Sequence, residues 1–134
     1  MSRVRRLVLA CSAALPPFAA AAQGALSGEQ VYRETCAACH ESGIDKAPKP
    51  GDRKAWAPLI KEGQHVLTAH AWVGVRKMPA RGGLPELTLD EFSRAVAHMA
   101  RASGGRWPDP DAKLLTRIER EVSKRQAHLA RDDK

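Results

Sequence analysis

The chain has 134 residues, of which 43% are hydrophobic and only 4% aromatic, and its formal net charge is +7. This length fits one small domain, and such a domain can be short of apolar core. The positive charge does not indicate nucleic acid, because basic and aromatic residues are not interleaved as in proteins that bind single strands. We therefore expect no nucleic-acid partner.

The first 22 residues have the features of a secretory signal peptide. Three arginines precede an apolar stretch, Leu7 to Ala22, that closes with Ala20-Ala21-Ala22 before Gln23. Small residues are typical of a cleavage site, and the stretch is too short and too interrupted by Pro16 and Pro17 for a membrane-spanning helix. We predict cleavage of residues 1–22 and a periplasmic mature protein, whose formal charge falls from +7 to +4 because the three arginines are lost.

The mature chain is expected to begin with a helix. Ser27 and Gln30 have the spacing of a capping box, in which each side chain bonds the backbone N–H of the other residue. The helix runs toward Cys36, and Gly28 and Tyr32 lie four residues apart on one of its faces. The glycine would allow another helix to approach closely.

Residues 36–40 read Cys-Ala-Ala-Cys-His, the attachment sequence of a covalent c-type haem. The thiols of Cys36 and Cys39 can form thioethers with the haem vinyl groups, and His40 is then placed to ligate the iron. A thioredoxin-like redox pair would need a βαβ context, and a zinc site would need a second ligand pair at a suitable spacing. The sequence offers neither. Signal cleavage also removes Cys11, so no cysteine remains for a disulfide.

The middle of the chain alternates loops and short helices. Residues 41–52 contain two glycines and two prolines, which favour a loop. Two helices are predicted next, over Arg53–Leu59 and Gln64–Val75. Pro58 should limit the first of them. Residues 76–83, with a proline and two glycines, form a second predicted loop, and this loop contains Met78.

A further helix is predicted from a second capping box, formed by Thr88 and Glu91. Its apolar residues recur at helical spacing. They are Leu89, Phe92, Val96 and Met99. Ser103 and the two glycines after it should end this helix.

The C-terminal segment, residues 106–134, contains eight Lys or Arg and six Asp or Glu. We predict one helix over Ala112–Leu129 with a narrow apolar stripe, which consists of Leu115, Ile118, Val122 and Leu129. Mixed charge with a thin apolar stripe is typical of a solvated helix that lies on its own domain. The alternative is a docking element for a redox partner or a membrane complex. The sequence thus predicts an all-α fold, with one domain over 23–105 and a charged helical extension over 106–134.

Met78 is a candidate sixth ligand of the haem iron. It lies in a polar, glycine-rich loop, whereas Met99 continues the apolar stripe of a helix and is expected to pack in the core. A thioether opposite the imidazole of His40 raises the reduction potential. Two bound axial ligands leave no open coordination site, which suits electron transfer. A histidine is the alternative ligand, namely His65, His70 or His98.

Together these residues resemble the class I cytochromes c, and specifically the short bacterial cytochrome c-five branch. The resemblance covers about residues 25–103 and rests on an ordered set of elements. These are Gly28-x-x-x-Tyr32-x-x-x-Cys36-x-x-Cys39-His40, Ala47-Pro48, Gly51-Asp52, Trp56-x-Pro58, Met78-Pro79-x-x-Gly82-Gly83 and a helix that ends near His98-Met99. Residues 106–134 have no counterpart in the short members.

The resemblance implies a helical wrap around one covalent haem c with its iron. It implies that the first and last core helices cross near Gly28 and Tyr32. It also implies His40 as the proximal and Met78 as the distal iron ligand. Trp56 would lie near a haem propionate, as a candidate indole N–H donor.

One position departs from the family pattern. Many relatives have an aromatic residue where this chain has His98, so the sequence does not identify which side chain makes the contact at the helix crossing. Phe92 is the candidate substitute.

We expect a soluble periplasmic electron carrier rather than an enzyme, monomeric or a weak dimer. It would exchange single electrons with respiratory proteins and dock transiently at membrane complexes. Arg76, Lys77 and Arg81 flank the ligand loop and should form a positive rim that attracts acidic partners. Two alternatives are a cytochrome subunit of a larger periplasmic dehydrogenase, and a haem sensor or enzyme whose distal site stays open.

Overall fold

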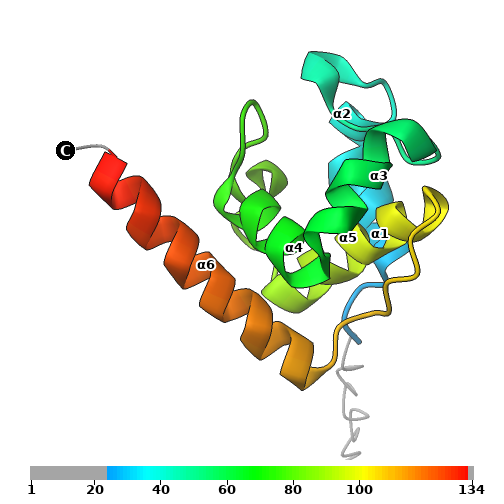
Figure 1. Cartoon of the computed structure of the whole chain (residues 1–134). Coiled ribbons are helices and arrows are strands. Elements are labelled where there is room, and N and C mark those ends of the chain that lie inside the picture. The colour runs from blue at the N-terminus through cyan, green and yellow to red at the C-terminus, as the bar shows by residue number, and fades with distance from the viewer. Residues whose placement is uncertain (1–23, 133–134) are drawn as a thin grey trace, which may run out of the picture.

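The computed structural model describes residues 24–132, so the predicted signal peptide lies outside the described residues. Within 24–132 the chain consists of helices joined by loops, without a β-strand (Figure 1). In chain order these are α1 (Gly28–Val31), the π turn η1 (Tyr32–Cys36), α2 (Ala37–His40), the 3-10 turn η2 (Ile44–Lys46), α3 (Arg53–Glu62), α4 (Gln64–Val73), the 3-10 turn η3 (Ala80–Gly83), α5 (Leu89–Ala102) and α6 (Ala112–Asp132). The all-α prediction is confirmed.

The N-terminal helical segment runs without a break from α1 through α2. It begins with the predicted capping box, because the Ser27 hydroxyl accepts from the Gln30 N–H at 3.2 Å and the Gln30 side chain accepts from the Ser27 N–H at 2.9 Å. The π turn η1 was not predicted from the sequence. It ends at Cys36, and such turns inside α-helices often occur at functional sites.

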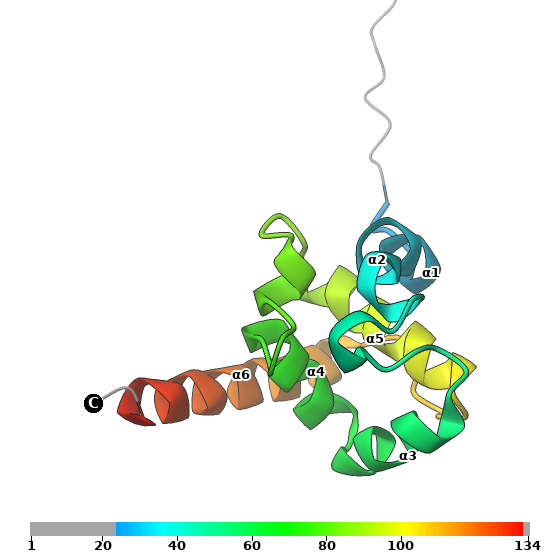
Figure 2. The same cartoon turned by 90° about the horizontal axis from the view of Figure 1, so that it is seen from above.

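α1 and α5 cross in direct backbone contact, and both views show them adjacent (Figures 1 and 2). A Cβ atom added to Gly28 would lie 2.2 Å from the carbonyl oxygen of Arg94. Only a residue without a side chain allows this approach. The close crossing expected at Gly28 is therefore confirmed.

The aromatic contact at this crossing differs from the expectation. The rings of Tyr32 and His98 pack against each other with centroids 5.5 Å apart. Phe92 instead meets the edge of Trp72, at a centroid distance of 5.3 Å. The suggestion that Phe92 substitutes at the crossing is wrong, because the imidazole of His98 itself supplies the flat ring.

α3 and α4 differ from the predicted helices at their C-terminal ends. α3 continues to Glu62, and Pro58 lies inside it. Proline removes one helical hydrogen bond, to the carbonyl of Lys54; both residues are exposed, so water can take its place. α4 ends two residues earlier than predicted, because Gly74 adopts a φ of 100°.

α5 supplies more buried residues than any other helix of the described chain. Seven of its residues are buried, namely Phe92, Ser93, Ala95, Val96, Ala97, Met99 and Ala100. At its end the hydroxyl of Ser103 donates to the Met99 carbonyl at 2.8 Å and accepts from the Gly51 N–H at 3.0 Å. The buried Ser103 thereby ties the loop before α3 to the end of α5.

We expect Ser103→Ala to destabilise the protein by about 1 kcal/mol, the usual net contribution of one hydrogen bond, because the bond that ties the Gly51 N–H to the end of α5 is lost. The free energy of unfolding in denaturant measures this. Ser123→Ala is the control, since the exposed Ser123 hydroxyl bonds only the Glu119 carbonyl of its own helix. Equal stability of the two variants would contradict the role assigned to Ser103.

α6 lies along α4 and then extends past the rest of the molecule (Figures 1 and 2). Ile118 and Val122 are buried against Ala69 of α4, and Trp72 joins this cluster to the main core. Val122 is the last buried residue among those of α6 that the structure describes. The extension is thus a helix on its own domain for part of its length, and a projecting arm for the rest.

No helix within residues 24–132 combines the length and the apolar character needed to cross a bilayer.

Candidate functional site

A large apolar cavity lies between the helices of the domain. It has about 1160 Å³ of empty space, part of which is open to solvent. Its lining is mostly apolar, with a few polar groups, as in small-molecule and cofactor sites. The five site residues predicted from the sequence all line it, namely Cys36, Cys39, His40, Trp56 and Met78.

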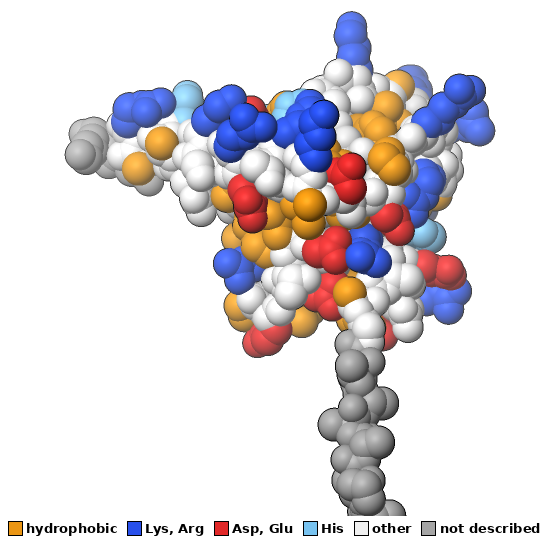
Figure 3. Space-filling view, turned by 90° about the horizontal axis from the view of Figure 1, so that it is seen from below, with side chains coloured by type: hydrophobic (Ala, Val, Ile, Leu, Met, Phe, Trp, Pro, Cys, Tyr) orange, Lys and Arg blue, Asp and Glu red, His pale blue; other side chains and the backbone are white. Residues whose placement is uncertain are grey.

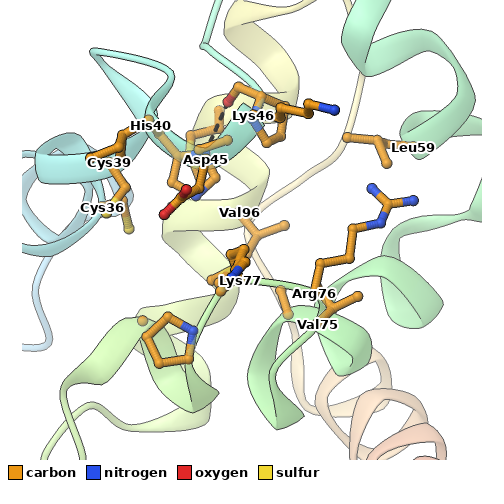
Figure 4. Close-up of a pocket in the computed structure, with 18 of the residues that line it drawn as sticks. Cys36, Cys39, His40, Asp45, Lys46, Leu59, Val75, Arg76, Lys77 and Val96 are labelled. Carbon is orange, nitrogen blue, oxygen red and sulfur yellow. Dashed lines mark hydrogen bonds between the residues drawn. The ribbon is translucent and has the colours of Figure 1, made fainter.

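The lining residues come from separate walls. Figure 4 shows Cys36, Cys39 and His40 together on one side, and Val75 and Arg76 on the other. α5 lies between them and contributes Phe92, Val96 and Met99 to the lining. A flat ligand inserted here would have the motif on one face and the 75–79 loop on the other.

The two motif cysteines are free thiols, and Cys36 is buried whereas Cys39 is exposed. Burial, and to a smaller extent the neighbouring Cys39, raises the pKa of Cys36 to about 11. The Cys36 thiol is therefore uncharged at neutral pH, as a thioether would be. No group of three or more His, Cys, Asp or Glu side chains suited to a metal ion occurs within the described range, so the zinc alternative has no ligand set there.

His40 is held in a defined orientation. It is 8% exposed, and its Nδ1 lies 2.9 Å from the carbonyl oxygen of Pro48. A carbonyl only accepts, so Nδ1 carries the proton and Nε2 keeps its lone pair. Metal-bound histidines typically have such a partner on the other nitrogen. The donor geometry of His40 therefore fits an iron porphyrin in the cavity.

Met78 lies at the end of a tight loop. Two backbone hydrogen bonds close this loop. The Met78 N–H donates to the Val75 carbonyl at 2.9 Å, and the Val75 N–H donates to the Met78 carbonyl at 3.1 Å. Arg76 within it adopts a φ of 55°, which costs energy for a residue other than glycine. The Met78 side chain packs against the main core. Met99 lines the same cavity from α5, so both methionines belong to its lining.

The alternative histidine ligands are not cavity residues. Of the five histidines in the chain, all of which the structure describes, only His40 lines the cavity. The others have different neighbours: His65 with Arg117 at 3.0 Å, His70 with Glu62 at 3.4 Å, His98 with Tyr32, and His128 with Asp132 at 2.8 Å. Among the histidines and methionines of the described chain, the cavity is lined by His40, Met78 and Met99.

Trp56 is buried, and its indole N–H donates to the Lys49 carbonyl at 3.0 Å. This donor holds the loop that follows the motif. Contact between Trp56 and a haem propionate stays a prediction, and it would require the indole N–H to be shared with Lys49 or released.

The positive rim differs in membership from the prediction. Arg76 and Lys77 line the cavity mouth and are exposed, but Arg81 is not part of it. The Arg81 guanidinium carbon lies 4.6 Å from the centroid of the Trp72 ring, where cation–π attraction favours it. Lys46, which lines the cavity from the loop after the motif, is the third basic residue instead. The sequence did not indicate Lys46, because it is thirty residues before Arg76. We call Lys46, Arg76 and Lys77 the basic rim.

Comparisons with known proteins identify the family of the chain. A family model described as "Cytochrome C oxidase, cbb3-type, subunit III" matches residues 23–99. The chain belongs to this family of class I c-type cytochromes. It therefore binds haem c covalently, together with its iron, and acts as a monohaem electron carrier with protein redox partners.

The matches to several relatives of this cytochrome cover nearly the whole length of each relative. Cytochrome c-555 of Chlorobaculum thiosulfatiphilum is 42% identical over 83 residues, which are 59% of this chain and 96% of that protein. Cytochrome c5 of Azotobacter vinelandii is 37% identical over 79 residues, 58% of this chain and 95% of that protein. A chain from a structure titled "Crystal structure of electron transfer complex of nitrite reductase with cytochrome c" has a TM-score of 0.55 and 42% identity, covering 57% of this chain and 93% of that one.

Proposed function

We propose that this cytochrome is a periplasmic carrier of single electrons in which His40 and Met78 ligate the haem iron. The observation that carries the proposal is the cavity itself. His40 and Met78 line it from different segments, and the other four histidines of the chain lie elsewhere. A site with both axial positions filled suits electron transfer and leaves no place for an oxygen substrate.

Bound haem supplies the one-electron iron couple. The residues of the chain would hold and tune it. Cys36 and Cys39 provide the thioether sulfurs. The bond from His40 Nδ1 to Pro48 keeps the ring oriented and makes Nε2 a better donor. The Met78 thioether would favour ferrous iron and so raise the potential.

We further propose that residues 1–22 are removed on export and that residues 106–134 form an extension to a haem domain of 23–105. The start of the family match at residue 23 and its end at residue 99 support both boundaries. The N-terminal sequence of the mature protein tests the first boundary, and it should begin at Gln23.

The test of the proposed function is a visible spectrum of the protein exported together with a cytochrome c maturation system. We expect haem that survives denaturation, and, in the ferric state, the weak near-red band of iron bound to methionine sulfur. Covalent haem without this band, together with ready binding of carbon monoxide to ferrous iron, would mean an open distal site. The protein would then be a sensor or an enzyme.

The basic rim is expected to attract negatively charged redox partners. Replacing its three residues by glutamine should slow oxidation of the reduced cytochrome by ferricyanide, an anionic probe, by roughly tenfold at low salt. The difference should vanish at high ionic strength, where charges are screened. The control is Arg33→Gln, Lys54→Gln and Lys61→Gln, which removes the same charge from exposed positions outside the cavity lining. Equal slowing in both variants would contradict a role for the rim.

A further inference from the structure

The exposed side of α6 presents a row of basic residues. They follow one another at intervals of three or four positions and all are exposed: Lys113, Arg117, Arg120, Lys124, His128 and Arg131. This spacing places them on one face of a helix. Figure 3 shows basic side chains in a row along the projecting helix. We call these six residues the basic stripe.

The first half of α6 is packed on the domain. On the other side of α6, Ile118 and Val122 are buried against Ala69. Arg117 also contacts His65 of α4, at 3.0 Å. From Lys113 to Arg131 the stripe is about 27 Å long, at 1.5 Å per residue. It is therefore a line of charge on one helix, the first half of which is packed on the domain.

Acidic neighbours neutralise little of the stripe. Lys124 pairs with Glu121 at 2.7 Å, and His128 pairs with Asp132 at 2.8 Å. The stripe members of both pairs are well exposed, and exposed pairs contribute little and exchange readily with other anions. An external anionic surface could therefore take the place of either carboxylate.

The stripe lacks the features of a protein-binding surface. Interfaces between proteins usually have an apolar centre with large side chains that fill pockets. The exposed large hydrophobic residues of the described chain are Ile44 and Leu84, and neither lies in α6. Mobile lipid headgroups need charge but no matching shape. The described residues of α6 also do not line the haem cavity, so a redox partner on the stripe would not cover its mouth.

We propose that the basic stripe docks α6 on the anionic phospholipid headgroups of a bilayer. Basic residues near such a surface are attracted to it by charge, without insertion of apolar side chains. The cytochrome would be held at the membrane through the extension, while the basic rim stays free for redox partners. Because α6 lies outside the residues that match the family, this docking would be a property of the extension.

The experiment uses the mature, haem-loaded chain and sedimentation with lipid vesicles. One set of vesicles contains phosphatidylcholine alone, and the other also contains phosphatidylglycerol. We expect binding only to the second set, and release in about 1 M salt, where the screening length falls to about 3 Å. Binding to neither set, or to both equally, would overturn the proposal.

A neutralised stripe tests the residues themselves. Lys113→Gln, Arg120→Gln and Lys124→Gln together should weaken vesicle binding by roughly a hundredfold, from three lost surface charges. Arg117 is kept because it contacts α4. The control removes the same charge elsewhere, at Arg33, Lys54 and Lys61, and should bind as the unmodified protein does. Circular dichroism should show an unchanged helix content in both variants.

Two further results would refute the proposal. Equal weakening in the stripe and control variants would mean that only net charge matters. Vesicle binding that survives in the stripe variant, while electron transfer to an acidic redox protein slows, would make the stripe a protein-docking surface. Vesicle binding requires neither Met78 nor a particular potential, so its failure is distinct from failure of the proposed iron ligation.

Discussion

Replacing Met78 by leucine should remove the near-red ferric band and lower the reduction potential by on the order of 0.1 V, within the range of about 0.8 V that axial ligands set. The backbone bonds between Met78 and Val75 do not involve the side chain, and leucine has a similar volume. The loop should therefore persist. Redox titration followed by visible absorbance measures both effects, and ferrous iron should then bind carbon monoxide.

Met99→Leu is the matched control for this variant. Met99 is 3% exposed and lines the same cavity, but it lies on α5 next to Val96 rather than in the loop that faces the motif. It should keep the band and the potential. If Met99→Leu abolishes the band and Met78→Leu does not, the ligand assignment is reversed. If both variants keep it, neither sulfur is bound.

The helix starts were predictable because they depend on local hydrogen bonds. Ser27 with Gln30, and Thr88 with Glu91, form capping boxes at both predicted positions. Glycine at position 28 would also allow a close helix approach, and the family resemblance implied the crossing there, which the contact with Arg94 confirms. The capping boxes involve residues that are near in sequence, and glycine is the residue type whose missing side chain permits close backbone approach.

Helix interiors and ends were predicted less well. Pro58 was expected to limit α3, but the helix continues because the loss of one hydrogen bond is tolerated at an exposed position. The π turn before Cys36 has no sequence signal of its own, since any α-helical sequence can include one extra residue in a turn. Tertiary contacts decide such cases.

The site was predicted as a list of residues, and the structure adds the pairs that position them. No pattern linked His40 to the Pro48 carbonyl, or Trp56 to the Lys49 carbonyl, because a backbone acceptor is independent of residue type. Arg81 was grouped with its neighbours in sequence, although its guanidinium is held over Trp72. Charge near a motif in sequence is a poor guide to charge near a cavity.

Gly28→Ala should destabilise the protein by about 3 kcal/mol, near the upper end for overpacked sites. The added Cβ would meet the Arg94 carbonyl oxygen at 2.2 Å and its carbon at 2.6 Å. These are backbone atoms, so no side chain can turn away and α1 must separate from α5. The thermal midpoint should fall by roughly 10 °C or more. The helical segment from α1 to α2 also carries the haem-attachment motif, so the yield of haem-loaded protein should decrease.

Gly24→Ala provides the comparison, because a Cβ there would have no heavy atom within 4 Å. It removes the same backbone freedom from the unfolded chain without creating a contact. We expect its thermal midpoint to match that of the unmodified protein. Should Gly28→Ala match it as well, α1 and α5 do not cross in backbone contact, and the helical segment that carries Cys36 and His40 is positioned in another way.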